Sequence, residues 1–515
     1  MNEDRSTDKL AALLQRFKEQ RGDGRADDAA TADGEGPIPR RSAGAGLATE
    51  PVPASFAQRR LWLLDRLEPG SSAYNMPFPA RLRGRLPVRA LHRSLREVLR
   101  RHGSLRTTFG VRDRLPVQRV EAYAAERWPL PVVDLSRLPA ERAERVAEAL
   151  LDREANTPFD LEAGPVYRMR LLRLGAEHHV LLQTMHHIVS DGWSIGVCFR
   201  ELARLLAAFA VGESSPLDEP PIQYTDFTLW QRERLEGELL EQQLAYWRER
   251  LAPPPGSREI PTLELPFDRP RPPVQSHRGG TVQAVFPAEL AAGLRTLGRN
   301  HGASLFMVLL AAFDVLMQRY SGQTDIVVGT PTAGRERLEV EGLVGLFLNS
   351  LALRADLSGN PSFGELVRRV RTTALGAAAH QEVPFERLLE ELQPERHLSH
   401  SPIFQVFFNM INLPDYRFDL PGLEVEILTP PTEGSKFDLT LYAEDAAQGL
   451  RLDLVYDADL FDRPRMEEML RQYRRVLEQV VAEPERPVDE LTLLTGDAQR
   501  VLPDPAAPLS DAWRG

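Results

Sequence analysis

A chain of 515 residues is too long for one ordinary hydrophobic core and predicts two or more packed units. Its 63 Lys and Arg residues against 74 Asp and Glu residues give a net charge of −11, and no dense basic cluster points to nucleic acid as the main partner. The single cysteine, Cys198, excludes an internal disulfide, and no apolar run is long enough to cross a bilayer. We therefore expect a cytoplasmic protein without a membrane partner.

Residues 1–50 form a segment that we expect to be separate from the main fold. Apolar side chains at helical spacing predict a short helix within residues 7–20, with Thr7 as its cap: Leu10, Leu13, Leu14 and Phe17. From Gly22 to Glu50 large apolar residues are almost missing, which predicts a disordered linker. The helix either packs on its own domain or is a docking element for an upstream polypeptide.

The first folded unit, residues 51–227, combines helices and strands. Helices are expected over residues 55–67, 88–102 and 195–210, and strands over residues 105–109, 166–174 and 180–185. The last two strands are separated by the turn-like residues 175–177, so we expect them to pair as neighbours. This half is therefore an α+β unit.

The second unit, residues 228–490, has a similar pattern. Helices are expected over residues 304–320, 363–379 and 466–480, and strands over residues 325–330, 351–354 and 405–411. Ligand sites are common at the interface between two such units. The sequence therefore indicates a site in the cleft between two α+β halves.

The most informative segment is Met185–Ser194, where two adjacent imidazoles end a buried apolar strand. Imidazole is the side chain best suited to move protons near neutral pH. This favours acyl or group transfer in which His187 acts on the reacting atoms. Neighbouring residues of a strand point to opposite faces, so His186 and His187 cannot easily share one metal ion. Asp191 is close enough to shape the turn, and Gly192 allows a sharp one. A structural His pair is the alternative interpretation.

The chain resembles a condensation domain of a nonribosomal peptide synthetase, in the chloramphenicol-acetyltransferase-like superfamily. The resemblance covers about residues 53–490 and rests on seven ordered motifs, the third being His-His-x-x-x-Asp-Gly: residues 55–62, 101–109, 186–192, 224–230, 345–350, 380–386 and 396–402. Gly103 stands where the family usually has Glu in the second motif. That departure leaves the implied activity standing but weakens any inference about local packing.

The resemblance implies both a fold and a reaction. The fold would be an α+β pseudo-dimer of two chloramphenicol-acetyltransferase-like halves in a V, with a central tunnel. Donor and acceptor carrier proteins would present substrates on phosphopantetheine arms, and the domain itself would bind no cofactor or metal. The acceptor amine would attack the donor thioester to form an amide. Because a thioester is already activated, no covalent enzyme intermediate is required.

The resemblance also implies roles for individual residues. His187 would be the general base or would position the amine, and the backbone N–H of Gly192 would contact the oxyanion. His186 and Asp191 would be structural, with Arg335 as the ion-pair partner of Asp191. Simple turn and core packing remains the alternative for the residues expected to shape the tunnel: Ser190, Trp193 and Asn349.

Related families narrow the function further. Epimerization domains usually carry a Glu-Gly-His-Gly-Arg-Glu stretch, whereas this chain has Pro-Thr-Ala-Gly-Arg-Glu at residues 331–336. Heterocyclization domains replace the His-His signature with an Asp-rich one, so the intact signature of this chain excludes that function. A recruitment module that binds carriers without turnover remains the alternative function. Residues 73–75 and the intact first motif are most similar to the subtype that joins an L-configured donor to an L-configured acceptor.

The last segment, residues 491–515, resembles the linker that leads into an adenylation domain. We therefore expect an adenylation domain downstream as a further partner. The donor carrier is expected on a separate polypeptide that docks through residues 7–20.

Overall fold

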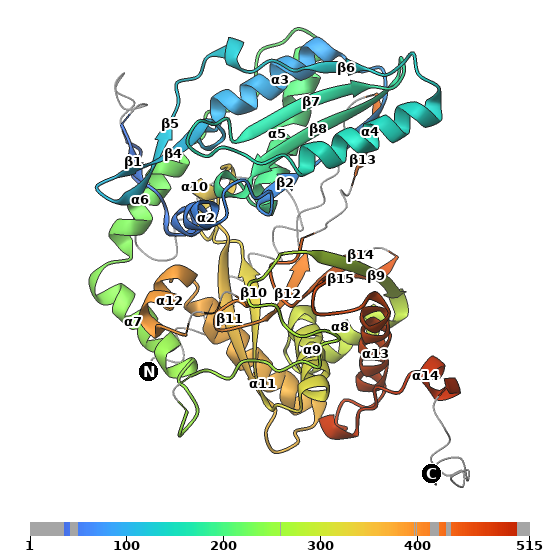
Figure 1. The fold of residues 1–515 in the computed structure, drawn as a ribbon. Helices are drawn as coiled ribbons and strands as arrows, with labels where there is room; N and C mark the ends of the chain where they lie inside the picture. The colour runs from blue at the N-terminus through green and yellow to red at the C-terminus, as the bar shows by residue number, and fades with distance from the viewer. Residues whose placement is uncertain are drawn as a thin grey trace.

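The chain forms two α+β halves, each with one six-stranded sheet, and Figure 1 shows the N-terminal half above the C-terminal half. This computed structural model describes residues 36–41, 50–257, 259–395, 397, 399–411, 422–428, 434–446 and 448–501. The helix predicted over residues 7–20 lies outside the described residues. The mixed α+β class predicted from the sequence is confirmed.

The sheet of the N-terminal half has the order β13-β3-β8-β7-β6, and β2 also pairs with β8. Its strands are β2 (Asn75–Pro77), β3 (Ala80–Gly84), β6 (Val132–Asp134), β7 (Tyr167–Arg173), β8 (His178–His186) and β13 (Leu423–Ile427). The helices of this half are α2 (Phe56–Leu67), α3 (Val88–Arg101), α4 (Ala140–Ala155), α5 (Gly192–Ala210) and α6 (Tyr224–Arg234). The predicted pairing of the two central strands, β7 and β8, is confirmed.

Strand β8 is apolar on both faces because helices cover both. Leu181 and Met185 belong to the cluster under α3 and α5, whereas Val180 and Leu182 belong to the cluster under α4. Figure 1 shows α4 crossing one face of the sheet and α3 and α5 lying on the other. Side chains alternate along a strand, so neighbouring residues of β8, which ends at His186, point to opposite faces of the sheet.

A second, three-stranded sheet, in the order β1-β5-β4, lies in the same half. Its strands are β1 (Val52–Pro53), β4 (Thr107–Arg112) and β5 (Leu115–Val120). The strand predicted over residues 105–109 begins later than expected, since residues 103–106 form a 3-10 turn. The hydroxyl of Thr107 donates to the carbonyl of Gly103, 3.0 Å away, and stabilises that turn.

The C-terminal half is built on the sheet β11-β10-β12-β14-β15-β9. Its strands are β9 (Gly279–Pro287), β10 (Asp325–Thr332), β11 (Asn349–Asp356), β12 (Val406–Ile411), β14 (Leu439–Ala446) and β15 (Gly449–Asp457). Its helices are α7 (Gly237–Arg250), α8 (Ala288–Asn300), α9 (Leu305–Ser321), α10 (Leu338–Glu341), α11 (Phe363–Ala379), α12 (Phe385–Leu392), α13 (Arg463–Ala482) and α14 (Gly496–Val501). Every helix and strand predicted in this half is present.

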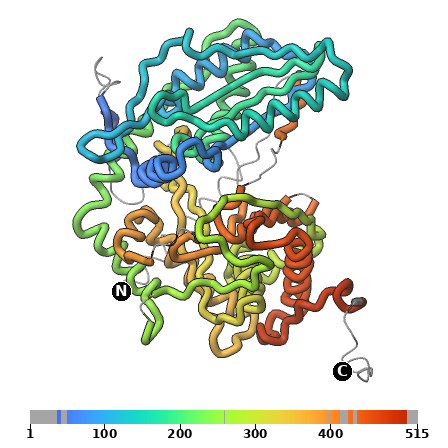
Figure 2. Tube along the Cα trace, in the orientation of Figure 1, coloured from blue at the N-terminus to red at the C-terminus, as the bar shows by residue number. Residues whose placement is uncertain are grey.

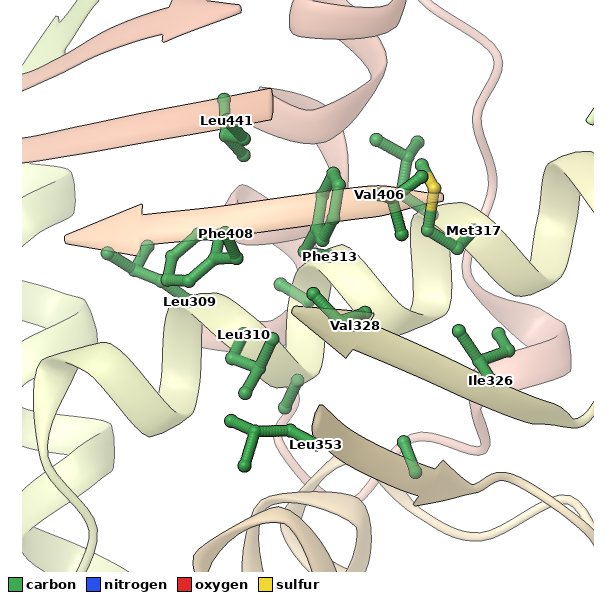
Figure 3. Close-up of a cluster of buried hydrophobic side chains, with 14 of the residues drawn as sticks. Leu309, Leu310, Phe313, Met317, Ile326, Val328, Leu353, Val406, Phe408 and Leu441 are labelled. Atoms are coloured by element: carbon green, nitrogen blue, oxygen red, sulfur yellow. The ribbon is translucent and has the colours of Figure 1, made fainter. Parts of the chain in front are cut away.

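Helix α9 is the centre of the C-terminal core. Residues 308–318 of this helix are all buried, which explains why it is apolar all round rather than on one stripe. Figure 3 shows Phe313 and Leu309 beside Phe408 of β12, with Val328 of β10 next to them. The side chain of Ser304 caps the helix, and Gly322 ends it with a left-handed φ of 74°.

Two segments cross the boundary that we predicted between residues 227 and 228. That boundary falls inside helix α6, which runs continuously across it. Strand β13, from the C-terminal part of the sequence, pairs antiparallel with β3, and Figures 1 and 2 show this orange segment beside the blue-green strands. A Cβ on Gly84 would lie 2.5 Å from the carbonyl oxygen of Gly422, so glycine permits this approach. Local patterning cannot show which sheet an edge strand joins.

Residues 36–41, inside the segment predicted to be a disordered linker, pack on the main fold, which corrects that expectation. Ile38, flanked by two prolines, is 3% exposed in a cluster with Ile222 and Phe347, because a single large apolar side chain is enough to fill a gap there. The backbone of Arg41 donates to Asp226 at 3.2 Å. At the other end, Leu491 is fully buried, and residues 496–501 form α14. Residues 502–515 lie outside the described part of the chain.

No single helix in the described ranges is long and apolar enough to span a membrane. One pair, α8 and α9, meets the criteria of length and composition only when both helices are taken together, and they are bent by 101° at the break between them. Both helices contribute to the core of the C-terminal half.

Candidate active site

His186 is the last residue of β8 and points into packed protein. It is 3% exposed, and its Nδ1 accepts a hydrogen bond from the backbone N–H of Ile188 at 3.1 Å. Its ring lies edge-on to Phe159, with 5.9 Å between centroids. Burial lowers the pKa of His186 to about 3, and the positive charges nearby act in the same direction. The ring is therefore neutral near pH 7 and has the contacts of a structural histidine.

His187 begins the next 3-10 turn and keeps part of its surface accessible. Its backbone N–H donates to the carbonyl of Tyr74 at 2.9 Å, and its Nδ1 lies 2.8 Å from the carbonyl oxygen of Ser190. A carbonyl oxygen only accepts, so Nδ1 carries the proton in the neutral ring. Within the described residues no hydrogen bond to Nε2 is found. The lone pair of Nε2 is thus the basic group of the site.

The charge state of His187 follows from its surroundings. Burial lowers the pKa of this imidazole, and the ammonium of Lys436 lowers it further, whereas Asp191 and the Ser190 carbonyl oppose the shift. A lowered pKa keeps the ring neutral at physiological pH. Only a neutral imidazole can accept a proton, so the ring starts in the form that a base requires, while the same surroundings disfavour the imidazolium that proton transfer would create.

Asp191 caps helix α5 and is committed to structural contacts. Its Oδ1 accepts from the backbone N–H of Ser194 at 2.8 Å, and the Ser194 hydroxyl lies 2.7 Å from the same oxygen. Its Oδ2 accepts from the backbone N–H of Phe347 at 3.0 Å. The cap also explains why α5 begins at Gly192 and not at residue 195, as the apolar pattern predicted.

Arg335 reaches this cap from the segment between β10 and β11. Its Nη2 lies 3.2 Å from Asp191 Oδ1 and 2.9 Å from the Ser194 hydroxyl. Its Nη1 donates to the carbonyl of Leu343 at 2.7 Å, and its guanidinium lies 4.0 Å from the ring centroid of Phe347. The ion pair expected from the sequence is present. The ion pair connects the residues after His187 to a segment of the C-terminal half. Figure 1 shows that segment, with α10 in yellow, reaching into the upper half.

The remaining predicted site residues of the histidine turn have mainly backbone or packing contacts. Gly192 is the first residue of α5 and therefore has a helical backbone, so the sharp turn that we expected it to allow is not formed there. Ser190 is buried, and its backbone carbonyl forms the hydrogen bond with His187 Nδ1. The indole N–H of Trp193 donates to the carbonyl of Glu341 at 2.8 Å. The expectation that Ser190 and Trp193 shape a tunnel stays a prediction.

Asn349 lies at the start of β11, and its amide binds backbone groups. Its Nδ2 donates to the carbonyls of Gln381 and Val383 at 2.9 and 2.7 Å. Its Oδ1 accepts from the N–H groups of Ser350 and Phe385, each at 2.9 Å. Three of these four bonds hold residues 381–385, where α12 begins, and a role for Asn349 in shaping the substrate path stays a prediction.

Sequence reasoning missed Lys436, which comes from the residues just before β14. Its Nζ lies 4.6 Å from the ring centroid of Tyr74, the residue whose carbonyl binds the backbone of His187. A signal for it exists in the composition, because Lys436 is the only lysine after residue 18.

Metal and thiol chemistry find little support in the geometry of this region. In the part of the chain that the structure describes, no group of three or more His, Cys, Asp and Glu side chains is arranged to hold a metal ion. Cys198 lies on α5 and is buried in the apolar cluster between this helix and α3, and burial raises the pKa of its thiol. A protonated thiol in an apolar cluster is a packing group rather than a nucleophile.

A histidine with a neutral ring thus lies near a buried Asp–Arg pair at the boundary of the two α+β halves. The condensation domain model matches residues 48–502, and the chain belongs to that family. Condensation domains of nonribosomal peptide synthetases are acyltransferases that form peptide bonds between carrier-bound substrates.

Relatives of this chain are subunits of such synthetases. It is 46% identical over 453 residues to one of the linear gramicidin synthase subunits of Brevibacillus parabrevis, which is 88% of this chain and 6% of that protein. It is 40% identical over 486 residues to phosphinothricin tripeptide synthetase PhsB of Streptomyces viridochromogenes, which is 94% of this chain and 39% of that protein. The chain thus spans less than half of the length of each of these relatives.

Solved structures show the same fold. The X-domain from teicoplanin biosynthesis is 32% identical, with a TM-score of 0.77 over 86% of this chain and 98% of that one. The condensation domain of the Monacolin K polyketide synthase MokA, at 23% identity, has a TM-score of 0.74 over 85% of this chain and 99% of that one.

Proposed function

We propose that this chain is a catalytically active condensation domain that joins a carrier-bound acyl or peptidyl donor to a carrier-bound aminoacyl acceptor. The observation that carries the proposal is the state of His187. Its Nδ1–H is held by the Ser190 carbonyl, and its Nε2 is left as a basic lone pair. A structural histidine such as His186, in contrast, is buried and has its Nδ1 bound to a backbone N–H.

The proposed reaction needs one proton acceptor and good alignment. The nitrogen of the acceptor amine attacks the donor thioester carbon, and its proton passes to His187 Nε2 as the C–N bond forms. The carbonyl electron pair moves onto oxygen and returns as the C–S bond breaks. The imidazolium of His187 then gives its proton to the departing thiolate, so the products are an amide and a free phosphopantetheine thiol, and the histidine is neutral again. The phosphopantetheine arms arrive with the carriers.

Other residues support this step in the proposal. The backbone N–H of Gly192, at the start of α5, is the group we assign to the oxyanion, because the positive end of a helix dipole favours negative charge. His186, Asp191 and Arg335 hold the turn in place. Alignment of two carrier-bound substrates in a tunnel shaped by Ser190, Trp193 and Asn349 would contribute as much as proton transfer.

The partners follow from the class of protein. Donor and acceptor carrier proteins are the proposed substrates, with an adenylation domain downstream and an upstream polypeptide that docks through residues 7–20. Support comes from relatives of which this chain spans 6% and 39%, since the rest of each is available for other domains. We further propose the L-donor and L-acceptor subtype and a cytoplasmic location.

The test is single-turnover transfer between loaded carriers, followed by intact-protein mass spectrometry. His187→Ala should slow transfer of the acyl mass on the order of 10²–10⁴-fold. His178→Ala is the matched control, since His178 begins the same strand and is partly exposed, and it should leave the rate unchanged. Equal rates for wild type and His187→Ala would show that this imidazole is not the base.

A recruitment module without turnover is the second candidate. It is favoured by the similarity to the teicoplanin X-domain, which is also known in a complex with OxyB. The intact contacts around His187 and Asp191 count against it, because a silent domain has no need to keep them. Carrier binding without any transfer across several loaded pairs would establish this second function instead.

A further inference from the structure

A cavity of about 390 Å³ lies beside helix α3 and the C-terminal end of α5 in the N-terminal half. Ligand sites in proteins have volumes of this order. The cavity is lined by residues of both helices and of the segment after β5, among them Arg89, His92, Arg93, Arg96, Tyr123 and Phe209. At a rise of 1.5 Å per residue, Phe209 lies roughly 25 Å along α5 from Gly192, so this cavity is separate from the histidine turn.

Three arginines on one face of α3 make the cavity positive: Arg89, Arg93 and Arg96. Their spacing of four and three residues brings like charges together, which destabilises a helix. Arg89 is also in the first turn, where the helix dipole disfavours a cation and where α3 has no acidic residue. Within the described part of the chain, none of the three side chains forms an ion pair or a hydrogen bond. An acidic protein with a net charge of −11 thus keeps three unpaired cations side by side.

The last two arginines of α3 show that carboxylate partners are available to this helix. Arg100 donates twice to the carboxylate of Glu97, at 2.9 Å in each bond. Arg101 donates twice to the carboxylate of Glu201, at 3.0 and 2.9 Å. Glu97 also lines the cavity, but its charge is already balanced by Arg100. The positive charge of the cavity therefore remains available to a ligand.

Part of the cavity wall is held in a fixed orientation. The guanidinium of Arg93 lies over the ring of Phe209, 3.8 Å from the centroid, and Phe209 is itself buried. A guanidinium that stacks on a ring keeps the N–H donors at its edges free for an anion. The Nε2 of His92 lies 2.8 Å from the carbonyl oxygen of Trp128, which holds the neighbouring side chain in place. A site that is ordered before binding loses less entropy when the ligand arrives.

We propose that this cavity binds a phosphate group, either free phosphate or the phosphate of a small phosphorylated molecule, through Arg89, Arg93 and Arg96. The fork of arginine donors matches phosphate oxygens, and a phosphate dianion balances more of the three charges than a single carboxylate can. The cavity is also larger than a phosphate ion needs, and Tyr123 offers an aromatic wall to the rest of a ligand. The proposal does not depend on the amide-forming activity proposed above.

The test is isothermal titration calorimetry of the full chain in low-salt Tris buffer, with inorganic phosphate and phenyl phosphate as separate probes. We expect one ligand per chain. Arg93→Gln and Arg96→Gln should each weaken binding roughly tenfold or more, because each removes charge-assisted hydrogen bonds. Arg145→Gln is the matched control, since it removes an exposed arginine from α4 on the other face of the sheet. It should leave the affinity unchanged.

Thermal unfolding gives a second readout and shows that each variant is folded. Phosphate should raise the unfolding midpoint of the wild type more than sodium chloride does at equal ionic strength, and Arg93→Gln should lose this difference. Tighter binding of phenyl phosphate than of inorganic phosphate would identify a phosphorylated molecule as the ligand, whereas equal or weaker binding would assign the site to free phosphate. No binding of either probe, or the same affinity in the wild type and both glutamine variants, would overturn the proposal.

Discussion

The carboxylate of Asp191 and the guanidinium of Arg335 form an ion pair with 3.2 Å between the nearest atoms, although their side chains are only 3% and 1% exposed. Each partner also binds the backbone of the segment at residues 340–347. The pair therefore joins the start of α5 to a part of the chain that follows β10. Its removal should loosen the turn of His187 without touching the imidazole.

Asp191→Ala should lower the free energy of unfolding by about 3–5 kcal/mol, because it leaves the guanidinium buried without its partner. Arg335→Met should cost a similar amount for the same reason. The double variant should lose less than the sum, since no stranded charge remains. Urea unfolding of the four proteins measures this coupling, and strictly additive losses would contradict it. A loss of activity in Asp191→Ala would then reflect structure rather than direct catalysis.

Asp314 is an unsatisfied acid in the core of the C-terminal half. It lies on α9 next to Phe313 of Figure 3, is 1% exposed, and neither carboxyl oxygen has a hydrogen-bond partner among the described residues. Burial raises its pKa well above the ordinary value. The folded state thus holds a proton that the unfolded state releases, so this group stabilises the fold below pH 4 and loses that contribution as pH rises toward its folded pKa.

Asp314→Leu should therefore raise the midpoint of thermal unfolding, and the gain should be larger at pH 8 than at pH 5. The expected stabilisation at neutral pH is on the order of 1–3 kcal/mol, the usual cost of a buried polar group without a partner. Calorimetry at the two pH values checks it. A gain that is equal at both would mean that the carboxyl does not change its protonation on unfolding in this range.

Ile38 anchors the short segment that precedes the main fold. Its side chain packs among aromatic and aliphatic residues, and its N–H donates to Glu339 at 3.3 Å. Ile38→Asp should release residues 36–41, because a carboxylate cannot remain in that cluster. Hydrogen exchange of these residues should rise while the main thermal transition moves little. Arg40→Asp, an exposed neighbour, is the matched control and should leave the exchange unchanged.

The backbone of Gly103 packs closely against the side chain of Gln223, which explains why glycine stands where the second motif usually has Glu. The Gln223 Oε1 accepts the N–H of Gly103 at 2.9 Å, and a Cβ at position 103 would meet that oxygen and Val120 at 3.1 Å each. Gly103→Glu should therefore destabilise the chain by roughly 1–3 kcal/mol through crowding. Gln223→Ser should recover part of the loss in the double variant, as denaturant unfolding would show. A loss that Gln223→Ser does not relieve would locate the strain elsewhere.

Local patterns predicted the elements well, whereas contacts between distant segments could not be read from them. The apolar run of β8 and the apolar helix α9 are recognisable in any window of the sequence, and both are present. The placement of β13 beside β3 depends on residues more than three hundred positions apart. Ile38 was missed because one apolar residue between prolines has no periodicity.

The candidate site was predictable to the same degree. The two histidines and Asp191 were found because they stand in the third motif. Arg335 lies outside the seven motifs and was expected as the partner of Asp191, and that ion pair is present. Lys436 also stands outside all seven motifs, and its contact with Tyr74 joins segments that lie far apart in the sequence. The capping bonds of Asp191, which start α5 three residues early, are likewise side-chain geometry that apolar spacing does not encode.

The pairing of β13 with β3 has a consequence for synthesis on the ribosome. Gly84 leaves the ribosome before its partner Leu423, and at 5–20 residues per second the gap of roughly 340 residues lasts roughly 20–70 s. During that time the finished N-terminal sheet has an open edge at β3, and an open edge can pair with another chain. The open β3 edge of one nascent chain can therefore pair with a neighbouring nascent chain on the same messenger before its own β13 is made. An N-terminal half expressed alone should self-associate, and a synthetic peptide of residues 421–429 should suppress it.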